Sequence, residues 1–200
     1  MKKIFFVFCL LMNASTILAQ DFSQFCKSLQ LMMAESKTGF PSFKGVLRDT
    51  SKAGQFRIKN EIIEGSQYES GMIYVDEKQD EDLYGAGARG NILTMWTRKI
   101  GDFTNTKADT VLYNQFLQYG GIIYNQCFPK YIVAQERLTP AKQASVIISF
   151  IISETPVLDS YKERDHKKCL NQPVLTMTLE RGYGSNEAFV RISIVYNYIK

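Results

Sequence analysis

Apolar side chains recur at spacings of three and four residues directly after the first twenty positions of the chain. The recurring positions are Phe22, Phe25, Cys26, Leu29 and Met33. Asp21 provides an N-terminal cap for this segment, and Gly39 followed by Pro41 provides a stop. The spacing therefore predicts an amphipathic helix from Phe22 to Lys37.

The hydrophobic pattern then changes to a period of two, which is typical of strands with one apolar face. The predicted strands are 56–62, 72–75, 92–98, 131–135, 144–153, 175–179 and 190–198. The last is the clearest, because Val190, Ile192 and Ile194 alternate with polar residues. The segment 144–153 is apolar on both faces, so we expect it to lie in the centre of a sheet.

A second helical stripe begins after Thr106 or Asp109, either of which can cap its start. The apolar positions of this stripe are Leu112, Phe116, Tyr119, Ile123 and Cys127. Gly120 and Gly121 lie in its middle, and each interior glycine costs about 1 kcal/mol relative to alanine. The pattern therefore leaves open a break at the glycines, with residues 122–124 extended.

Two amphipathic helices and six to seven strands must each bury an apolar face. Their order predicts an α+β fold, a two-layer sandwich of two helices on a mostly antiparallel sheet. The same order allows an αβββ unit used twice, although no residue identity supports a duplication.

Residues 1–19 have the pattern of a cleaved secretory signal. Two lysines precede the apolar run Ile4–Met12, which is too short to cross a bilayer, and Ala19 is a small residue suited to cleavage. We expect a single α+β domain over residues 20–200, outside the cytosol in the periplasm, at the cell surface or in the medium. No later segment approaches the roughly 20 apolar residues of a membrane helix, so we expect the mature protein to be soluble.

The charge of the chain is nearly balanced, with 24 basic and 20 acidic residues. Removal of Lys2 and Lys3 with the signal leaves 22 against 20, and acidic residues interrupt the densest basic run, Lys162–Lys168. A nucleic-acid-binding protein needs a clustered basic face. Charge and export together argue against nucleic acid as a partner.

Three cysteines remain after cleavage of the signal, which in an oxidising compartment suggests one disulfide and one thiol. We prefer a bond between Cys127 and Cys169, with Cys26 buried as a thiol on the first helix, although the other pairings stay open. None of the three has a CxxC neighbour, and His166 is the only histidine of the chain. The residues therefore predict neither a zinc site nor a bound cofactor.

The segment Gly85–Gly90 matches GxGxxG, but a strand-like segment follows it where a dinucleotide site needs a helix. We interpret it as a loop whose tip residue, Arg89, can contact an anion or a partner. The acidic segment Asp76–Asp82 lacks the ligand spacing of a calcium loop, which favours a solvated loop.

Catalytic motifs give little support for an enzyme. His166 and Cys169 are three residues apart, but their charged surroundings favour a solvent-exposed histidine over a nucleophilic pair. The sequence contains no GxSxG, HExxH or P-loop motif. A pair of carboxylates that are distant in sequence leaves a small extracytoplasmic hydrolase open as an alternative.

Tyrosines around the second helix are the best binding candidates, because tyrosine suits interfaces that are partly apolar and partly wet. We select Tyr113, Tyr119 and Tyr124, together with Arg89. Phe56–Glu64 has the charged residues of an edge strand and can accept an added strand from a partner. The expected function is thus binding of a protein or peptide without catalysis, and a carrier of an apolar ligand is a further alternative.

Overall fold

The computed structural model describes eight segments of the chain. These are residues 23–48, 54–59, 68–97, 100–103, 107–136, 146–157, 165–181 and 185–200. The predicted signal peptide, residues 1–19, lies outside the described residues, as do residues 60–67 and residues 162–164 of the basic run 162–168.

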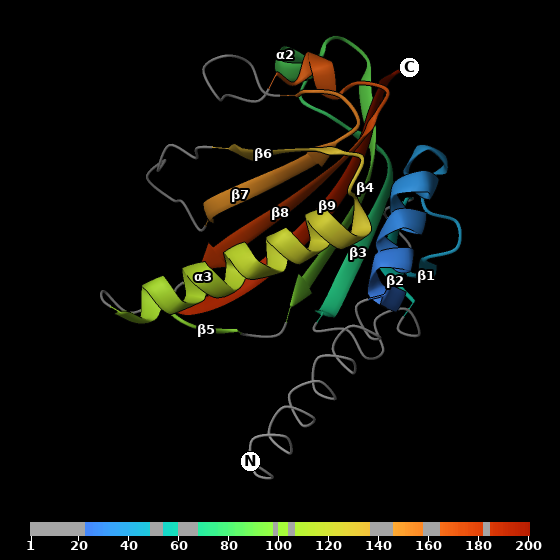
Figure 1. The fold of residues 1–200 in the computed structure, drawn as a ribbon. Helices are drawn as coiled ribbons and strands as arrows, with labels where there is room; N and C mark the ends of the chain where they lie inside the picture. The colour runs from blue at the N-terminus through green and yellow to red at the C-terminus, as the bar shows by residue number, and fades with distance from the viewer. Residues whose placement is uncertain are drawn as a thin grey trace, which may run out of the picture.

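An antiparallel sheet of nine strands forms the body of the protein (Figure 1). The strands are β1 (Lys44–Leu47), β2 (Gln55–Ile58), β3 (Tyr68–Lys78), β4 (Ala88–Thr97), β5 (Gly101–Asp102), β6 (Ile132–Glu136), β7 (Val146–Ser153), β8 (Pro173–Arg181) and β9 (Glu187–Ile199). Their order is β1-β2-β3-β4-β9-β8-β7-β6, with β5 paired to β9 outside this path. The α+β class with a mostly antiparallel sheet is therefore confirmed.

The predicted count of six to seven strands is too low, because β1 and β5 carry no periodic signal. β1 has four residues, of which Val46 and Leu47 are both exposed, and β5 has only two residues. Alternation cannot be recognised over such short segments. Strands of this length depend on pairing with a longer neighbour, as β5 does with β9.

The positions of two predicted strands in the sheet also differ from expectation. β2, which contains Phe56, lies between β1 and β3, so the described part of Phe56–Glu64 is not at an edge. β7 is next to the edge strand β6 and is not central. It is apolar on both faces because Ile152 belongs to the main core while Ile151 belongs to a second cluster on the opposite face.

Two long helical segments precede two groups of four strands. Residues 23–35 form the N-terminal helix, which continues into η1 (Ser36–Thr38) before β1 to β4. α3 (Lys107–Ile122) continues into a π-helical turn, Ile123–Cys127, before β6 to β9. Each group thus has four strands where an αβββ unit would have three, and β4 and β9 pair at the centre of the sheet.

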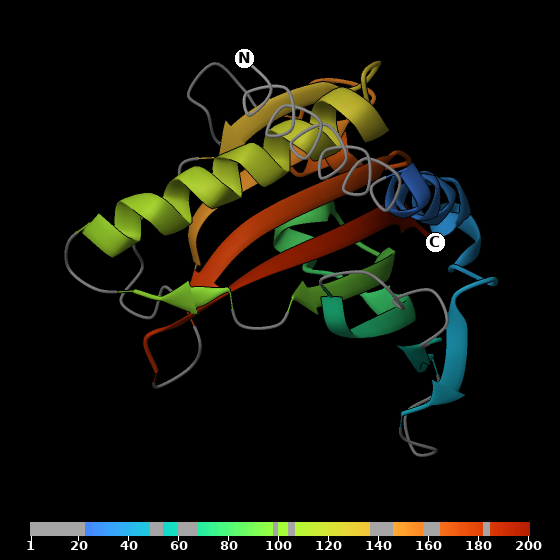
Figure 2. The same cartoon turned by 60° about the horizontal axis from the view of Figure 1, so that its bottom comes forward.

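Three short helical segments complete the described structure: α2 (Glu81–Tyr84), η1 and η4 (Lys167–Cys169). The N-terminal helix and α3 cover the same face of the sheet, as Figures 1 and 2 show. One apolar cluster joins Leu29 and Met32 of the first helix, Phe116 of α3, and Ile192 and Ile194 of β9. On the opposite face, Tyr84 packs against a smaller cluster formed by Ile151, Val157, Cys169 and Val174.

α3 runs through both glycines without a break, so the extended alternative for residues 122–124 is not observed. Gly120 faces the sheet, where a Cβ atom would lie 2.7 Å from the Met177 methyl group and 3.3 Å from the Phe150 ring. Gly121 faces away, and nothing lies within 4 Å of an added Cβ. The first glycine therefore allows α3 to approach the sheet closely, whereas packing does not explain the second.

The disulfide joins Cys26 and Cys127, whose Cα atoms are 4.7 Å apart. The predicted bond between Cys127 and Cys169 is therefore wrong. The N-terminal helix and the end of α3 meet on one face of the sheet, while Cys169 lies in the smaller cluster on the other face. The sheet itself thus separates the two cysteines of the predicted pair.

We expect the double variant Cys26→Ser/Cys127→Ser to lose about 4 to 5 kcal/mol of unfolding free energy, since the bond spans 101 residues of sequence. Urea-induced unfolding of the oxidised protein and the variant measures this difference. The reduced wild-type protein should match the variant. Equal stability of the oxidised protein and the variant would contradict the assignment.

The two glycines of α3 provide a matched pair of substitutions. Gly121→Ala should raise the free energy of unfolding by about 1 kcal/mol, because alanine favours helix and the added methyl group meets open space. Gly120→Ala makes the same helical gain but must displace Met177 and crowd Phe150, so we expect it to be less stable than Gly121→Ala by at least about 1 kcal/mol. Thermal or urea unfolding compares them, and the reverse order would show that α3 does not pack in this orientation.

Candidate functional site

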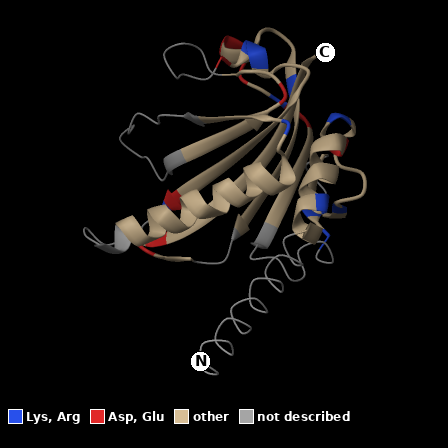
Figure 3. Ribbon diagram, in the orientation of Figure 1, with Lys and Arg blue, Asp and Glu red and all other residues tan. Residues whose placement is uncertain are grey.

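The solvent-facing side of α3 carries no charge over a long stretch. No Asp, Glu, Lys or Arg occurs between Thr110 and Pro129, although 22% of the chain is charged. Figure 3 shows the contrast with the N-terminal helix, which carries both signs of charge. Surface helices usually place charged residues on the face opposite the core, so α3 departs from the common pattern.

Three large apolar side chains of this uncharged segment are exposed. Val111 is 55% exposed, Tyr113 36% and Leu117 39%. Leu112 and Phe116 point the other way and are almost fully buried against the sheet. The exposed residues therefore do not contribute to the core of the described structure, and we call Val111, Tyr113 and Leu117 the outer face of α3.

A groove of about 380 Å³ runs beside α3 at its contact with the sheet. Its lining consists of Ile100, Gln115, Phe116, Gln118, Tyr119, Ile122 and Val190, none of which is charged at neutral pH. The Tyr119 ring also lies 6.5 Å from the ring of Phe25 on the N-terminal helix. The groove is thus uncharged, and at about 100° per residue it lies on the Val111 side of α3, whereas Tyr113 and Leu117 project from the other side.

The predicted binding residues fall in different places. Tyr119 lines the groove, Tyr113 belongs to the outer face, and Tyr124 packs against the main core from the π-helical turn. Arg89 lies apart from them on β4, where its Nη1 donates to the backbone oxygen of Asp76 at 3.1 Å. Tyr113 and Tyr119 both lie on α3 but project about 120° apart around the helix, so the structure does not gather the predicted residues into one site.

Arg89 belongs to a polar network around Asp76, a residue with a positive φ of 55° at an irregularity in the β3–β4 pairing. Asp76 Oδ1 accepts from the Tyr198 hydroxyl at 2.6 Å, and Asp76 Oδ2 is 2.9 Å from Lys200 Nζ. Asn91 Oδ1 accepts from the backbone N–H of Asp76 at 3.1 Å. This network ties β3 to the end of β9, which indicates a structural role.

The hydrogen bond between Tyr198 and Asp76 shifts both titrations. It is the main reason that the pKa of Asp76 is lowered, followed by the hydrogen bond from Lys200. Burial, and then the Asp76 carboxylate, raise the pKa of Tyr198 to about 12. The network is thus intact only while Asp76 is ionised and Tyr198 is protonated.

The acidic segment and the GxGxxG segment belong to the α2 region and the start of β4. Asp80 caps α2, its side chain accepting from the backbone N–H of Asp82 at 2.9 Å. The described part of the chain holds no cluster of three or more His, Cys, Asp or Glu residues suited to a metal ion. The GxGxxG segment leads from α2 into β4, which begins at Ala88, so it precedes a strand as the sequence indicates.

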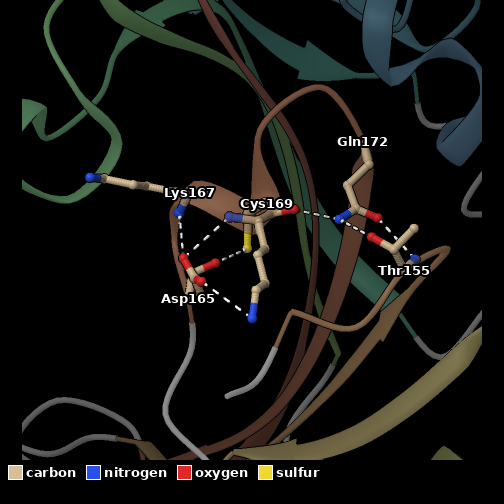
Figure 4. A network of polar contacts seen from close by, with 6 residues as sticks. Thr155, Asp165, Lys167, Cys169 and Gln172 are labelled. Carbon is tan, nitrogen blue, oxygen red and sulfur yellow. Dashed lines mark hydrogen bonds and ion pairs between the residues drawn. The ribbon is translucent and has the colours of Figure 1, made fainter.

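Cys169 is buried, and His166 packs against α2. Cys169 is 3% exposed, and its Sγ donates to the backbone oxygen of Asp165 at 3.4 Å (Figure 4). The His166 ring is half-buried and packs edge-on against Tyr84, 5.0 Å between ring centres. The histidine is therefore less exposed than the sequence predicts, because α2 lies against it.

Glu180 of β8 bears on the hydrolase alternative, because it is a partly buried carboxylate with a raised pKa. It lies on the sheet face opposite α3. Burial raises its pKa, while Arg191 and the Trp96 side chain act to lower it. Arg191 Nη2 lies 2.9 Å from its carboxylate. Its partners among the described residues are thus a guanidinium and an indole, which is not the carboxylate pair that a glycoside hydrolase needs.

Comparison with known proteins identifies no relative of the chain. No protein-family model matches the chain, and neither a curated protein nor a solved structure matches it. Among the described helices, none combines the length and the apolar character that crossing a bilayer requires.

The Asp76 network predicts a window of pH for its contribution to stability. Because the pKa of Asp76 is lowered on folding, its contribution is full above a pH of about 4 and is lost as the pH falls below that value. Because the pKa of Tyr198 is raised to about 12, its contribution is full below a pH of about 10 and is lost as the pH rises through 12.

A titration of tyrosine ring signals by NMR, assigned with Tyr198→Phe, measures this pKa directly. In Asp76→Asn the pKa of Tyr198 should fall but stay above 10, since burial is the larger cause. A Tyr198 pKa that does not change in Asp76→Asn would show that the two side chains are not bonded in solution.

Proposed function

We propose that this protein binds a partner protein or peptide, outside the cytosol, through the outer face of α3 and the groove beside it. The observation that carries the proposal is the uncharged character of a 20-residue surface segment that still exposes Val111, Tyr113 and Leu117. Exposed apolar side chains grouped on one element are typical of interaction sites, and tyrosine is enriched there.

The residues that line the groove favour a segment of a partner protein over the substrate of an enzyme as its occupant. Its uncharged lining offers no carboxylate, histidine or lysine for acid or base chemistry, so binding is the activity that its residues support. Gln115 and Gln118 are exposed at its rim, where their amides can bond to a peptide backbone. A large apolar side chain of the partner can then occupy the groove while its backbone lies along α3.

Two observations support the extracytoplasmic location. The N-terminal pattern of residues 1–19 is that of a secretory signal, and Cys26 forms a disulfide with Cys127. Disulfides persist in oxidising compartments and are rare in the cytosol. The proposed partner is therefore a protein exposed in the same compartment.

A carrier of an apolar ligand is the second candidate, because the groove volume of about 380 Å³ lies within the range of small-molecule sites. The two functions differ in what they need from the outer face of α3. A carrier uses the groove alone, whereas a partner protein also covers Leu117. Native mass spectrometry of the purified protein detects a retained small ligand and so separates the two.

Site-specific photo-crosslinking tests the proposal. A photoreactive amino acid at position 117 should capture a defined partner in the native host, whereas the same group at Leu83 on α2 should not. Leu83 is a matched control because it is 44% exposed, close to the 39% of Leu117, and lies on a different element. Leu117→Asp should then weaken binding of the captured partner at least about tenfold, because it places a charge in an apolar contact.

Equal capture from positions 117 and 83 would contradict the proposal. So would a captured partner that binds Leu117→Asp as well as it binds the wild-type protein. Unfolding curves of Leu117→Asp and Leu83→Asp exclude loss of the fold as the cause, since neither side chain is in the core.

A further inference from the structure

A second cleft, of a different chemical character, lies beside the N-terminal helix. It has a volume of about 330 Å³ and is bounded by the end of the N-terminal helix and by the chain ends of β6, β7 and β8. The lining residues with polar or aromatic groups include Gln30, Lys37, Tyr131, Glu154, Asn171 and Tyr196. None of them lines the groove beside α3.

A separate hollow of about 360 Å³ shares Gln30 and Tyr131 with the cleft. Tyr131 therefore stands between the two spaces. Its ring packs edge-on against Phe128 at 5.2 Å between centres, and its backbone N–H donates to the oxygen of Phe128 at 3.0 Å. The ring contact orients the Tyr131 side chain, and the hydrogen bond holds its backbone beside Phe128.

The wall that carries Glu154 is fixed by hydrogen bonds to Gln172 (Figure 4). Gln172 Oε1 accepts from the backbone N–H of Thr155 at 3.1 Å, and its Nε2 donates to Thr155 Oγ1 at 2.7 Å. Asn171 directly precedes Gln172 and lines the cleft. Glu154 and Asn171 thus belong to two segments that one side chain clamps together.

The opposing wall is the end of the N-terminal helix, which the sheet also holds. Asn91 Nδ2 donates to the backbone oxygens of Ser36 and Lys37, at 3.0 and 3.1 Å. Ser36 Oγ donates to the backbone oxygen of Met33 at 2.7 Å. Both walls are therefore preorganised, which lowers the entropic cost of binding a ligand.

The lining groups offer donors and acceptors without a net charge. Lys37 donates, the Glu154 carboxylate accepts, and the Asn171 amide does both. The Tyr131 hydroxyl donates to Glu154 Oε1 at 3.4 Å, which is long for an O–H···O bond and leaves room for a better partner. Burial, and then Glu154, raise the pKa of Tyr131, so its hydroxyl is a donor at neutral pH.

We propose that this cleft binds a saccharide unit. A sugar hydroxyl both donates and accepts, which matches the mixed groups of Lys37, Glu154 and Asn171, and its C–H face can stack on the ring of Tyr131. A strongly anionic or cationic ligand would leave one of the two charged side chains opposed by a like charge. The volume lies at the small end of ligand sites and fits one or two sugar rings.

Titration of the mature protein with glucose, galactose, mannose and N-acetylglucosamine, followed by amide chemical shifts, tests the proposal. At least one sugar should bind with a dissociation constant on the order of 1 mM and shift amides near Tyr131 and Glu154. Glu154→Gln, which keeps the shape of an exposed side chain, should weaken binding at least about tenfold, as should Tyr131→Ala. Tyr113→Ala on α3 is the matched control and should bind the sugar unchanged.

Absence of binding by all four sugars up to about 100 mM would overturn the proposal. Binding that is unchanged in both Glu154→Gln and Tyr131→Ala would also overturn it. The same titrations with glycine and lysine test a zwitterion, and binding of an amino acid without any sugar would assign the cleft to that ligand class instead. These outcomes are independent of the partner proposed for α3, because Tyr113→Ala and Leu117→Asp leave the cleft intact.

Discussion

The disulfide between Cys26 and Cys127 determines how the helical layer sits on the sheet. It links the N-terminal helix to the π-helical end of α3, with Cα atoms 4.7 Å apart, and Gln30 Nε2 donates to the backbone oxygen of Cys127 at 2.6 Å beside it. Ile122 lines the groove on one side of this junction, and Cys127 itself lines the hollow on the other. Both proposed binding sites therefore border the place where the two helices are joined.

The two sites differ in chemistry because different elements supply their side chains. The groove draws on α3, which has no charged residue for 20 positions, and on apolar side chains of β9 and the β5 region. The polar cleft draws on helix and strand ends, where chain reversals leave Glu154, Asn171 and Lys37 near solvent. The helix-covered side of the sheet thus carries both proposed sites, an uncharged groove beside α3 and a polar cleft beside the N-terminal helix.

Periodicity predicted most long elements correctly, since Ile192 and Ile194 repeat every second residue and Leu112 and Phe116 every fourth. It failed where contacts between distant parts of the chain determine the structure. The cysteine pairing depends on which face of the sheet carries Cys169, and β5 exists only through pairing with β9. The groove likewise needs Ile100 and Val190, which are distant in sequence, so no local pattern reveals it.

Amide hydrogen exchange of the oxidised and reduced protein would show directly whether the disulfide holds the helical layer in place. Reduction should speed exchange in residues 23–35 and 123–131, which the bond joins, while the paired strands β4 and β9 keep their protection. Unchanged exchange in both helical segments after reduction would contradict this, and would show that packing on the sheet alone fixes the helices and the two sites beside them.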